Sequence, residues 1–255
     1  MTTLTLLTKV YQSIQLKHVE RTVKNLFEGL SLEAKFLGAA PSGWVQIELS
    51  GEDEAVATNL LARQIGFCPT SLEQVKKFST LKGYVVNIER SREELLVDIG
   101  VFEPKTVRAA IPLSHLQAQL AQGRKTALKK IAALWGICEN LPISVKVVNA
   151  DPEEDRLSAE FSTEQIMKLW DWRESLLDRL LVVGASAYEV KTALERAELT
   201  RDVIDVEALG MFEHALVCKL GTDAAGLISR LGKLLRNGSF TVFNPKEIMN
   251  FLSNP

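Results

Sequence analysis

The sequence is poor in the residues and motifs from which catalytic and metal-binding sites are built. It has only three histidines among 255 residues. They lie in separate segments, and no His–His or His–Cys spacing fits a zinc site. There is no Gly-x-Gly-x-x-Gly motif and no Gly-Lys-Ser/Thr phosphate loop, and no serine, histidine and acid can be assigned as a triad. We therefore expect a non-catalytic protein without a metal or cofactor.

Cysteine, long apolar runs and excess positive charge are also scarce. The three cysteines, Cys68, Cys138 and Cys218, are odd in number and far apart, which favours buried thiols in a reducing compartment over a disulfide framework. No run approaches the roughly 18 apolar residues of a membrane span, and the start lacks the basic segment of a signal peptide. The net charge of −2 gives no global field that attracts nucleic acid. We expect a cytoplasmic protein that does not bind membranes.

The first 80 residues alternate between strand and helix patterns. Apolar periodicity predicts strand, helix, two strands, helix and strand, in that order, over 3–11, 13–29, 32–49, 51–66 and 67–72. This is the order of the ferredoxin-like fold.

The last 93 residues repeat the order after a lead-in helix over 162–178. Ser162 with Gln165, and Ser186 with Glu189, have the spacing of capping boxes. The predicted chain is therefore α+β, with a ferredoxin-like domain over 1–80, a central domain over 81–162, and the lead-in helix plus a second ferredoxin-like domain over 163–255.

The central segment is mostly strands, and its motifs are spaced in a recognisable way. The matching residues are Gly83-Tyr84-Val85, Val97-Asp98-Ile99-Gly100, Ser114, Leu116, Val145-Lys146-Val147, Asp151 and Arg156-Leu157. This spacing resembles the S-one-type RNA-binding domain, an OB barrel named after the largest protein of the small ribosomal subunit. The resemblance implies a barrel that binds RNA. The alternative is another small antiparallel meander.

The departures from that family put its usual RNA-binding face in doubt. Binding members carry aromatic side chains on the second and third strands, where bases stack. Here the second strand begins with Glu93 and Glu94, and Pro112 occupies the usual histidine position. Because the other aromatic side chains are missing, we expect Tyr84 to be the one remaining good stacking platform. The two acids on this face would also repel phosphate.

An insertion in the central domain is basic. From Pro104 to Cys138 it has six cations and no acid. The predicted nucleic-acid contacts are these cations and the tyrosine, namely Tyr84, Lys105, Arg108, Arg124, Lys125, Lys129 and Lys130. A helix is expected over 122–136, with Leu128, Ile131 and Trp135 as its buried stripe. The alternative is a solvated helix that covers one mouth of the barrel.

The whole layout resembles an uncharacterised archaeal three-domain family, most clearly over 212–228 (FEHALVCKLGTDAAGLI). In outline it is also similar to the RNA polymerase stalk subunit and to the alpha subunit of translation initiation factor two. These resemblances imply a nucleic-acid-associated, RNA-binding protein linked to transcription or translation proteins. The alternatives are a protein–protein adaptor whose barrel has lost RNA binding, and an enzyme with a site between domains.

Overall fold

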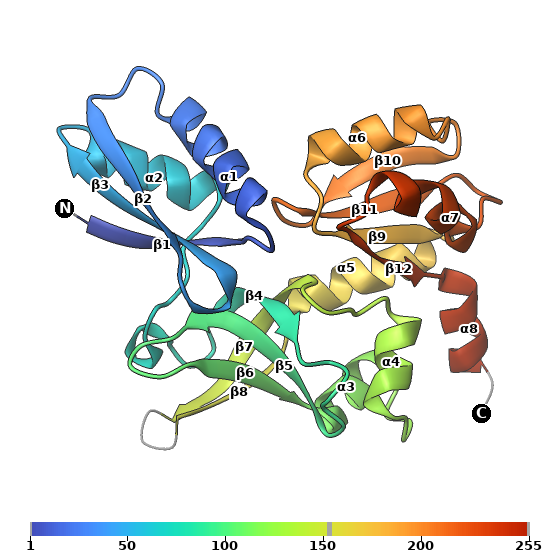
Figure 1. Ribbon diagram of the computed structural model, residues 1–255. Coiled ribbons are helices and arrows are strands. Elements are labelled where there is room, and N and C mark those ends of the chain that lie inside the picture. Colours follow the sequence, from blue (N-terminus) through green and yellow to red (C-terminus); the bar gives the residue numbers. More distant parts are fainter. Residues whose placement is uncertain (1, 152–154, 254–255) are drawn as a thin grey trace. The chain divides into compact units, whose positions relative to one another are not determined.

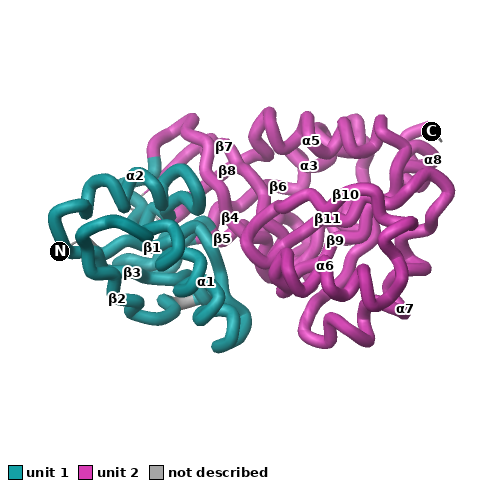
Figure 2. Tube along the Cα trace, turned by 90° about the horizontal axis from the view of Figure 1, so that it is seen from above, with its two compact units in different colours: residues 1–75, 99–107 teal, residues 76–98, 108–255 magenta. Residues whose placement is uncertain are grey.

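The computed structural model describes residues 2–151 and 155–253 (Figure 1). Within these ranges the chain is a mixed α+β protein with two open antiparallel sheets and one closed barrel of five strands. The barrel lies in the central part of the sequence, as predicted. Contacts along the chain define two compact units, one of residues 1–75 and 99–107, the other of residues 76–98 and 108–255 (Figure 2).

The first unit contains a three-stranded sheet and two helices. The elements are β1 (Thr2–Lys9), α1 (Ser13–Leu26), β2 (Leu32–Ala39), β3 (Trp44–Gly51) and α2 (Glu54–Gln64). The strand order is β1-β3-β2, and both pairings are antiparallel. Val19 and Val23 on α1 and Leu61 on α2 are fully buried, so the apolar helix faces predicted from the sequence form this core.

The fourth strand predicted for this region, over 67–72, is wrong. The chain makes one isolated bridge between Leu6 and Phe67, and another between Ser71 and Glu103. The backbone of Thr70 accepts hydrogen bonds from the amides of Phe102 and Glu103, each at 3.0 Å. The segment is therefore held by the hairpin of residues 99–107, which no local pattern could have indicated.

Gly100 sets how closely that hairpin approaches the segment. Its φ is +86°, and a Cβ atom on it would lie 2.4 Å from the Cβ atom of Cys68. Any side chain here would meet both backbone strain and a collision.

The barrel has the strand order β4-β5-β6-β8-β7. Its elements are β4 (Thr80–Val86), β5 (Glu94–Val101), β6 (Val107–Pro112), α3 (Leu113–Leu120), α4 (Leu128–Leu134), β7 (Pro142–Asp151) and β8 (Arg156–Phe161). Burial alternates along β7, with Ile143, Val145 and Val147 inside. The insertion helix expected over 122–136 begins only at Leu128: Gln122 and Gly123 have positive φ angles, and Ala127, the residue before the helix, is extended.

The C-terminal sheet has the order β10-β11-β9-β12, all antiparallel. The elements are α5 (Thr163–Glu174), β9 (Arg179–Val183), α6 (Ala187–Arg196), β10 (Val203–Ala208), β11 (Glu213–Cys218), α7 (Ala224–Leu234), β12 (Ser239–Phe243) and α8 (Pro245–Ser253). Helices α6 and α7 bury Val190, Leu227 and Leu231 against the sheet.

Of the two predicted capping boxes, one is complete. Ser186 and Glu189 exchange both hydrogen bonds at the start of α6. At α5, the Ser162 hydroxyl accepts from the amide of Gln165, but the Gln165 side chain turns away and accepts from the amide of Ser144 at 3.1 Å. The side chain that would close the box instead attaches α5 to barrel strand β7.

Aromatic side chains join α5 to its surroundings. The Trp135 and Trp170 ring centroids lie 5.2 Å apart, and those of Trp172 and Phe243 lie 5.3 Å apart. Leu169 and Trp172 on this helix are buried. Leu176 follows the end of the helix, is 45 % exposed and has a φ of +58°.

Candidate nucleic-acid interface

The barrel face expected to stack bases carries two exposed acids and a buried tyrosine. Glu93 and Glu94 are exposed, as the sequence suggested. Tyr84 is only 2 % exposed and lies opposite Asp98 in the β4–β5 pairing. Its ring is therefore not accessible for a base to stack on in this structure.

Arg124 in the insertion makes contacts within the protein. Its guanidinium donates to the carbonyl oxygens of Phe251 and Leu252, both at 2.5 Å, and lies 5.7 Å from the Phe251 ring centroid. These carbonyls belong to the last turn of α8, where helix carbonyls lack intrahelical partners. Arg124 therefore caps a helix, a role the sequence analysis did not anticipate.

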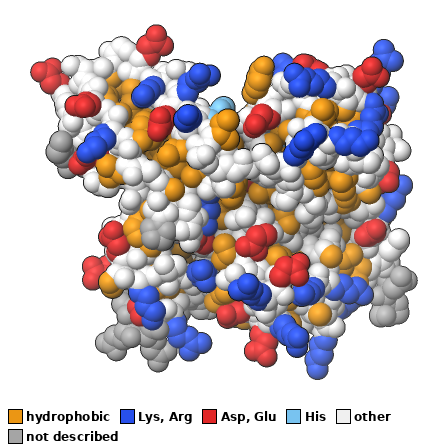
Figure 3. All heavy atoms as spheres, in the orientation of Figure 1, with side chains coloured by type: hydrophobic (Ala, Val, Ile, Leu, Met, Phe, Trp, Pro, Cys, Tyr) orange, Lys and Arg blue, Asp and Glu red, His pale blue; other side chains and the backbone are white. Residues whose placement is uncertain are grey.

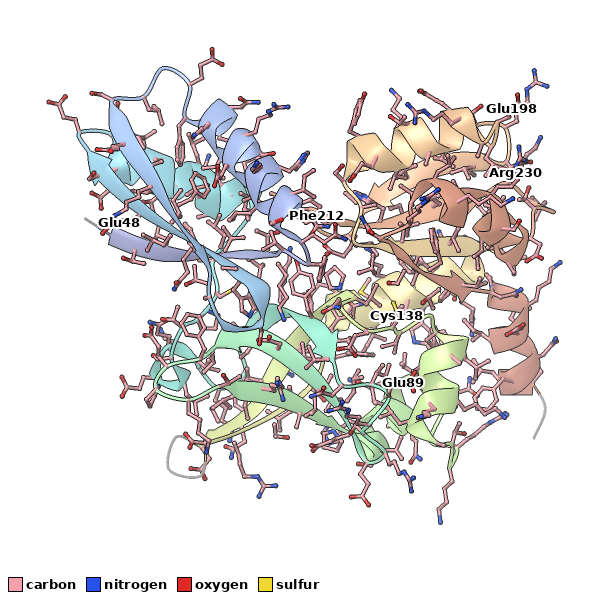
Figure 4. All side chains as sticks on the ribbon, viewed as in Figure 1. Glu48, Glu89, Cys138, Glu198, Phe212 and Arg230 are labelled. Carbon is pink, nitrogen blue, oxygen red and sulfur yellow. The ribbon has the colours of Figure 1, made fainter. Side chains whose placement is uncertain are left out.

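The other predicted cations differ in how far they are exposed. Lys125 is exposed, Lys130 lies 5.0 Å from the Phe251 ring centroid, and Lys129 forms an exposed ion pair with Glu89 at 3.3 Å. Glu89 is labelled beside α4 in Figure 4. Arg108 in the second unit is partly buried, whereas Lys105 is exposed in the first. On the face shown in Figure 3, cationic and acidic side chains are interspersed.

A second basic surface, which the sequence analysis missed, surrounds Phe78. This side chain is 64 % exposed, and the ammonium groups of Lys77 and Lys146 lie 5.2 Å and 5.9 Å from its ring centroid. The Phe78 amide donates to the carbonyl of Val147, which places the ring at the start of the β4–β7 pairing. An exposed aromatic ring with lysines beside it is the arrangement on which single-stranded nucleic acid stacks.

This surface continues along the outside of β4 and β7. Thr80 pairs with Lys146, and Lys82 pairs with Ser144. Residues two apart on a strand share a face, so Thr80 and Lys82 lie on one face of β4. Phe78 precedes the strand, and Lys146 connects its ring to this face. Lys146 also forms an ion pair with Glu160 at 3.4 Å. We call Phe78, Lys77, Lys82 and Lys146 the aromatic–lysine surface. The sequence Lys76-Lys77-Phe78 ahead of a strand was the available signal.

A hollow of about 240 Å³ lies beside this surface, between β4, β7, α5 and the end of β10. Its polar lining consists of Lys82, Ser144, Glu164, Gln165 and Lys168, and Trp172 contributes an aromatic wall. Gln165, Lys168 and Trp172 are three and four residues apart in turn, so α5 presents them on one face. We call this hollow the lysine pocket.

The charges around the lysine pocket are coupled. Burial lowers the pKa of Lys168; Glu207 acts to raise it, and the positive charges of Arg179 and Lys82 lower it further. Glu207 accepts from the Trp172 indole at 3.0 Å and from the Arg179 guanidinium at 3.5 Å. Arg179 is itself 5 % exposed, and burial lowers its pKa. The site therefore has three cationic side chains, Lys82, Lys168 and Arg179, and two carboxylates, Glu164 and Glu207.

The thiols show no activation. Burial raises the pKa of Cys138, and burial together with nearby aspartates raises the pKa of Cys218 to about 11, so both remain protonated near neutral pH. Over residues 2–151 and 155–253, no group of three or more His, Cys, Asp or Glu side chains is placed to hold a metal ion. In the same residues, no helix has the length and apolar character that crossing a membrane requires.

Comparison with protein families accounts for nearly the whole chain. Residues 3–71 match the DUF2110 N-terminal domain, residues 75–173 the DUF2110 central domain, and residues 177–243 the DUF2110 C-terminal domain. The chain belongs to the DUF2110 family. The three-part layout expected from the sequence is thus that of DUF2110, whose central domain contains the barrel.

Other comparisons add little to the DUF2110 match. No curated protein matches the chain. One similar solved structure is an uncharacterized protein from Methanocaldococcus jannaschii, at 14 % identity over 35 % of this chain and 96 % of that one. Its TM-score of 0.24 is too low to support an inference about fold or function.

Proposed function

We propose that this DUF2110 protein is a non-catalytic RNA-binding protein, associated with transcription or translation proteins, that holds single-stranded RNA on its aromatic–lysine surface. One observation carries the proposal. Phe78 is 64 % exposed and has the ammonium groups of Lys77 and Lys146 beside its ring. Base–aromatic stacking contributes about 1–3 kcal/mol per base, and lysines beside the ring contact the backbone.

RNA would then bind mainly beside β4 and β7 and less on the insertion than the sequence indicated. Arg124 is engaged with α8, and Tyr84 is buried. Lys125 and Lys130 are exposed, so they remain proposed phosphate contacts on a second, purely electrostatic surface. We further propose that the barrel is of the OB type and that the flanking sheets are ferredoxin-like. The order β10-β11-β9-β12 supports the latter, because it places the first strand of that domain between the third and fourth.

Fluorescence anisotropy with a short single-stranded RNA tests the proposal. Phe78→Ala should weaken binding by between about fivefold and a hundredfold, the range that the loss of one stacked base implies. Lys77→Glu with Lys82→Glu should weaken binding further and reduce its salt dependence, by about 0.7 in the log–log slope for each phosphate that the protein no longer neutralises.

Lys125→Glu with Lys130→Glu is the matched control, because it reverses the same amount of charge on the insertion. If this control abolishes binding while Phe78→Ala does not change it, the insertion is the binding surface and the assignment to β4 and β7 is wrong. If the wild type binds no RNA even at low salt, the adaptor function replaces the RNA-binding one. That second candidate is favoured by Tyr188 and Leu220, which are 75 % and 72 % exposed on the C-terminal domain.

A further inference from the structure

The lysine pocket contains an excess of positive charge that the protein does not neutralise. Among the residues that the structure describes, neither the Lys82 nor the Lys168 ammonium forms an ion pair with a carboxylate. Glu207 is already a hydrogen-bond acceptor for Trp172 and Arg179. Glu164, the acid in the lining, accepts from its own backbone amide and from Ser162, and these bonds lower its pKa and keep it ionised. The lining therefore has two ammonium groups, of Lys82 and Lys168, and one carboxylate. A pocket with this balance favours an anion.

The size of the pocket limits what that anion is. Its volume of about 240 Å³ lies below the 300–1,000 Å³ typical of sites for whole drug-sized ligands or cofactors. A phosphate group with part of its sugar is a better match than a complete nucleotide cofactor. The Lys168 ammonium lies 5.1 Å from the Trp172 ring centroid, so the indole positions this cation in the pocket.

We propose that the lysine pocket binds the terminal phosphate monoester of a single-stranded RNA. This inference rests on the proposed function, because Lys82 belongs both to the pocket and to the aromatic–lysine surface. Thr80 and Lys82 share one face of β4, and Lys146, which pairs with Thr80, lies 5.9 Å from the Phe78 ring centroid. An RNA strand stacked on Phe78 that runs past Lys146 and along this face of β4 therefore brings its end to Lys82 and then to Lys168.

The chemistry favours a phosphate monoester over the phosphodiesters of the chain interior. A terminal phosphate carries a charge of about −1.5 to −2 near neutral pH, whereas each internal phosphodiester carries −1. Two separate ammonium groups match a dianion, and lysine binds phosphate as a point charge. A bound dianion would also favour the protonated form of Lys168, which burial and the neighbouring cations disfavour. Binding should therefore weaken as the pH rises and Lys168 loses its proton.

The test compares RNAs of one sequence that carry a 5′-phosphate, a 3′-phosphate or no terminal phosphate, titrated calorimetrically into the full chain. We expect one phosphorylated form to bind about tenfold more tightly than the unphosphorylated form. Lys168→Gln and Lys82→Gln should each remove most of this preference, and Lys168→Gln should leave the affinity for unphosphorylated RNA within about twofold of wild type. Lys191→Gln, at an exposed position on α6, is the control that should keep the preference.

The outcomes separate this inference from the proposed function. Equal affinity for all three RNAs would overturn the terminal-phosphate assignment while leaving RNA binding intact. If no RNA binds, ribose 5-phosphate and inorganic phosphate serve as probes of the pocket alone. Saturable binding of ribose 5-phosphate that Lys168→Gln abolishes would keep the phosphate site and assign it to a small phosphate ester. Absence of binding by both probes would refute the site.

Discussion

Replacing Arg124 by alanine should loosen the C-terminal helix α8 without unfolding the rest of the protein. The guanidinium donates to the last-turn carbonyls of Phe251 and Leu252, both at 2.5 Å. A hydrogen bond to a charged group contributes about 1.5–3 kcal/mol, and a cation near a helix C-terminus adds about 0.3–1 kcal/mol. Arg124 is partly exposed, so water compensates for part of the lost hydrogen bonding and charge interaction. We therefore expect a net loss of about 2 kcal/mol in the stability of α8.

Amide hydrogen exchange measures this change directly. A loss of about 2 kcal/mol corresponds to exchange about 30-fold faster in α8 if its amides exchange through local opening. Ile248, buried on α8, should report the effect, whereas Leu216 in the C-terminal sheet should not. Lys130→Ala is the matched control, because Lys130 lies over the same Phe251 ring but makes no hydrogen bond to α8 in the described structure. Unchanged exchange in α8 of Arg124→Ala would refute the capping role and return Arg124 to the candidate phosphate contacts.

Three further predictions concern stability and domain division. Gly100→Ala should destabilise the first unit by about 1–3 kcal/mol in chemical denaturation, because the new Cβ atom meets Cys68 at a positive φ; a neutral effect would contradict the close approach. Burial lowers the pKa of His214, so the unfolded chain binds a proton more readily, and stability should fall as pH falls through and below 6.5. His214→Gln should flatten this pH dependence, measured as the urea midpoint at pH 7 and pH 5, and an identical pH dependence would exclude His214 as its source. The division at residues 80 and 163 predicts that limited proteolysis cuts first near these positions, whereas a first cut inside the barrel would contradict it.

The sequence predicted the parts of the fold that depend on local pattern. Alternation along β7 and the apolar stripes of α6 and α7 are consequences of strand and helix periodicity. The Ser186 capping box likewise depends on residues three apart. The predicted strand over 67–72 failed because its partners, Phe102 and Glu103, lie on a hairpin about 30 residues further along the chain.

The candidate sites were harder to predict, for two physical reasons. Arg124 carries the same charge as Lys125, but its hydrogen-bond partner lies 127 residues later, and only folding brings the two together. Tyr84 fits the motif of a binding strand, yet burial depends on what packs over the strand and not on the motif. Phe78 was overlooked because a single aromatic residue before a strand has no periodicity to mark it.

The hairpin of residues 99–107 has a consequence for the order in which the chain folds during synthesis. It is part of the first compact unit, and residues 1–75 are the rest of that unit. Protein domains generally fold from the N-terminus as they leave the ribosome. Here residues 1–75 cannot complete their fold until residues 99–107 are available. The residues that hold Thr70 and face Cys68 are synthesised only after the first barrel strand. We therefore expect a nascent chain stalled shortly after residue 75 to be more sensitive to protease in this region than one extended beyond residue 107.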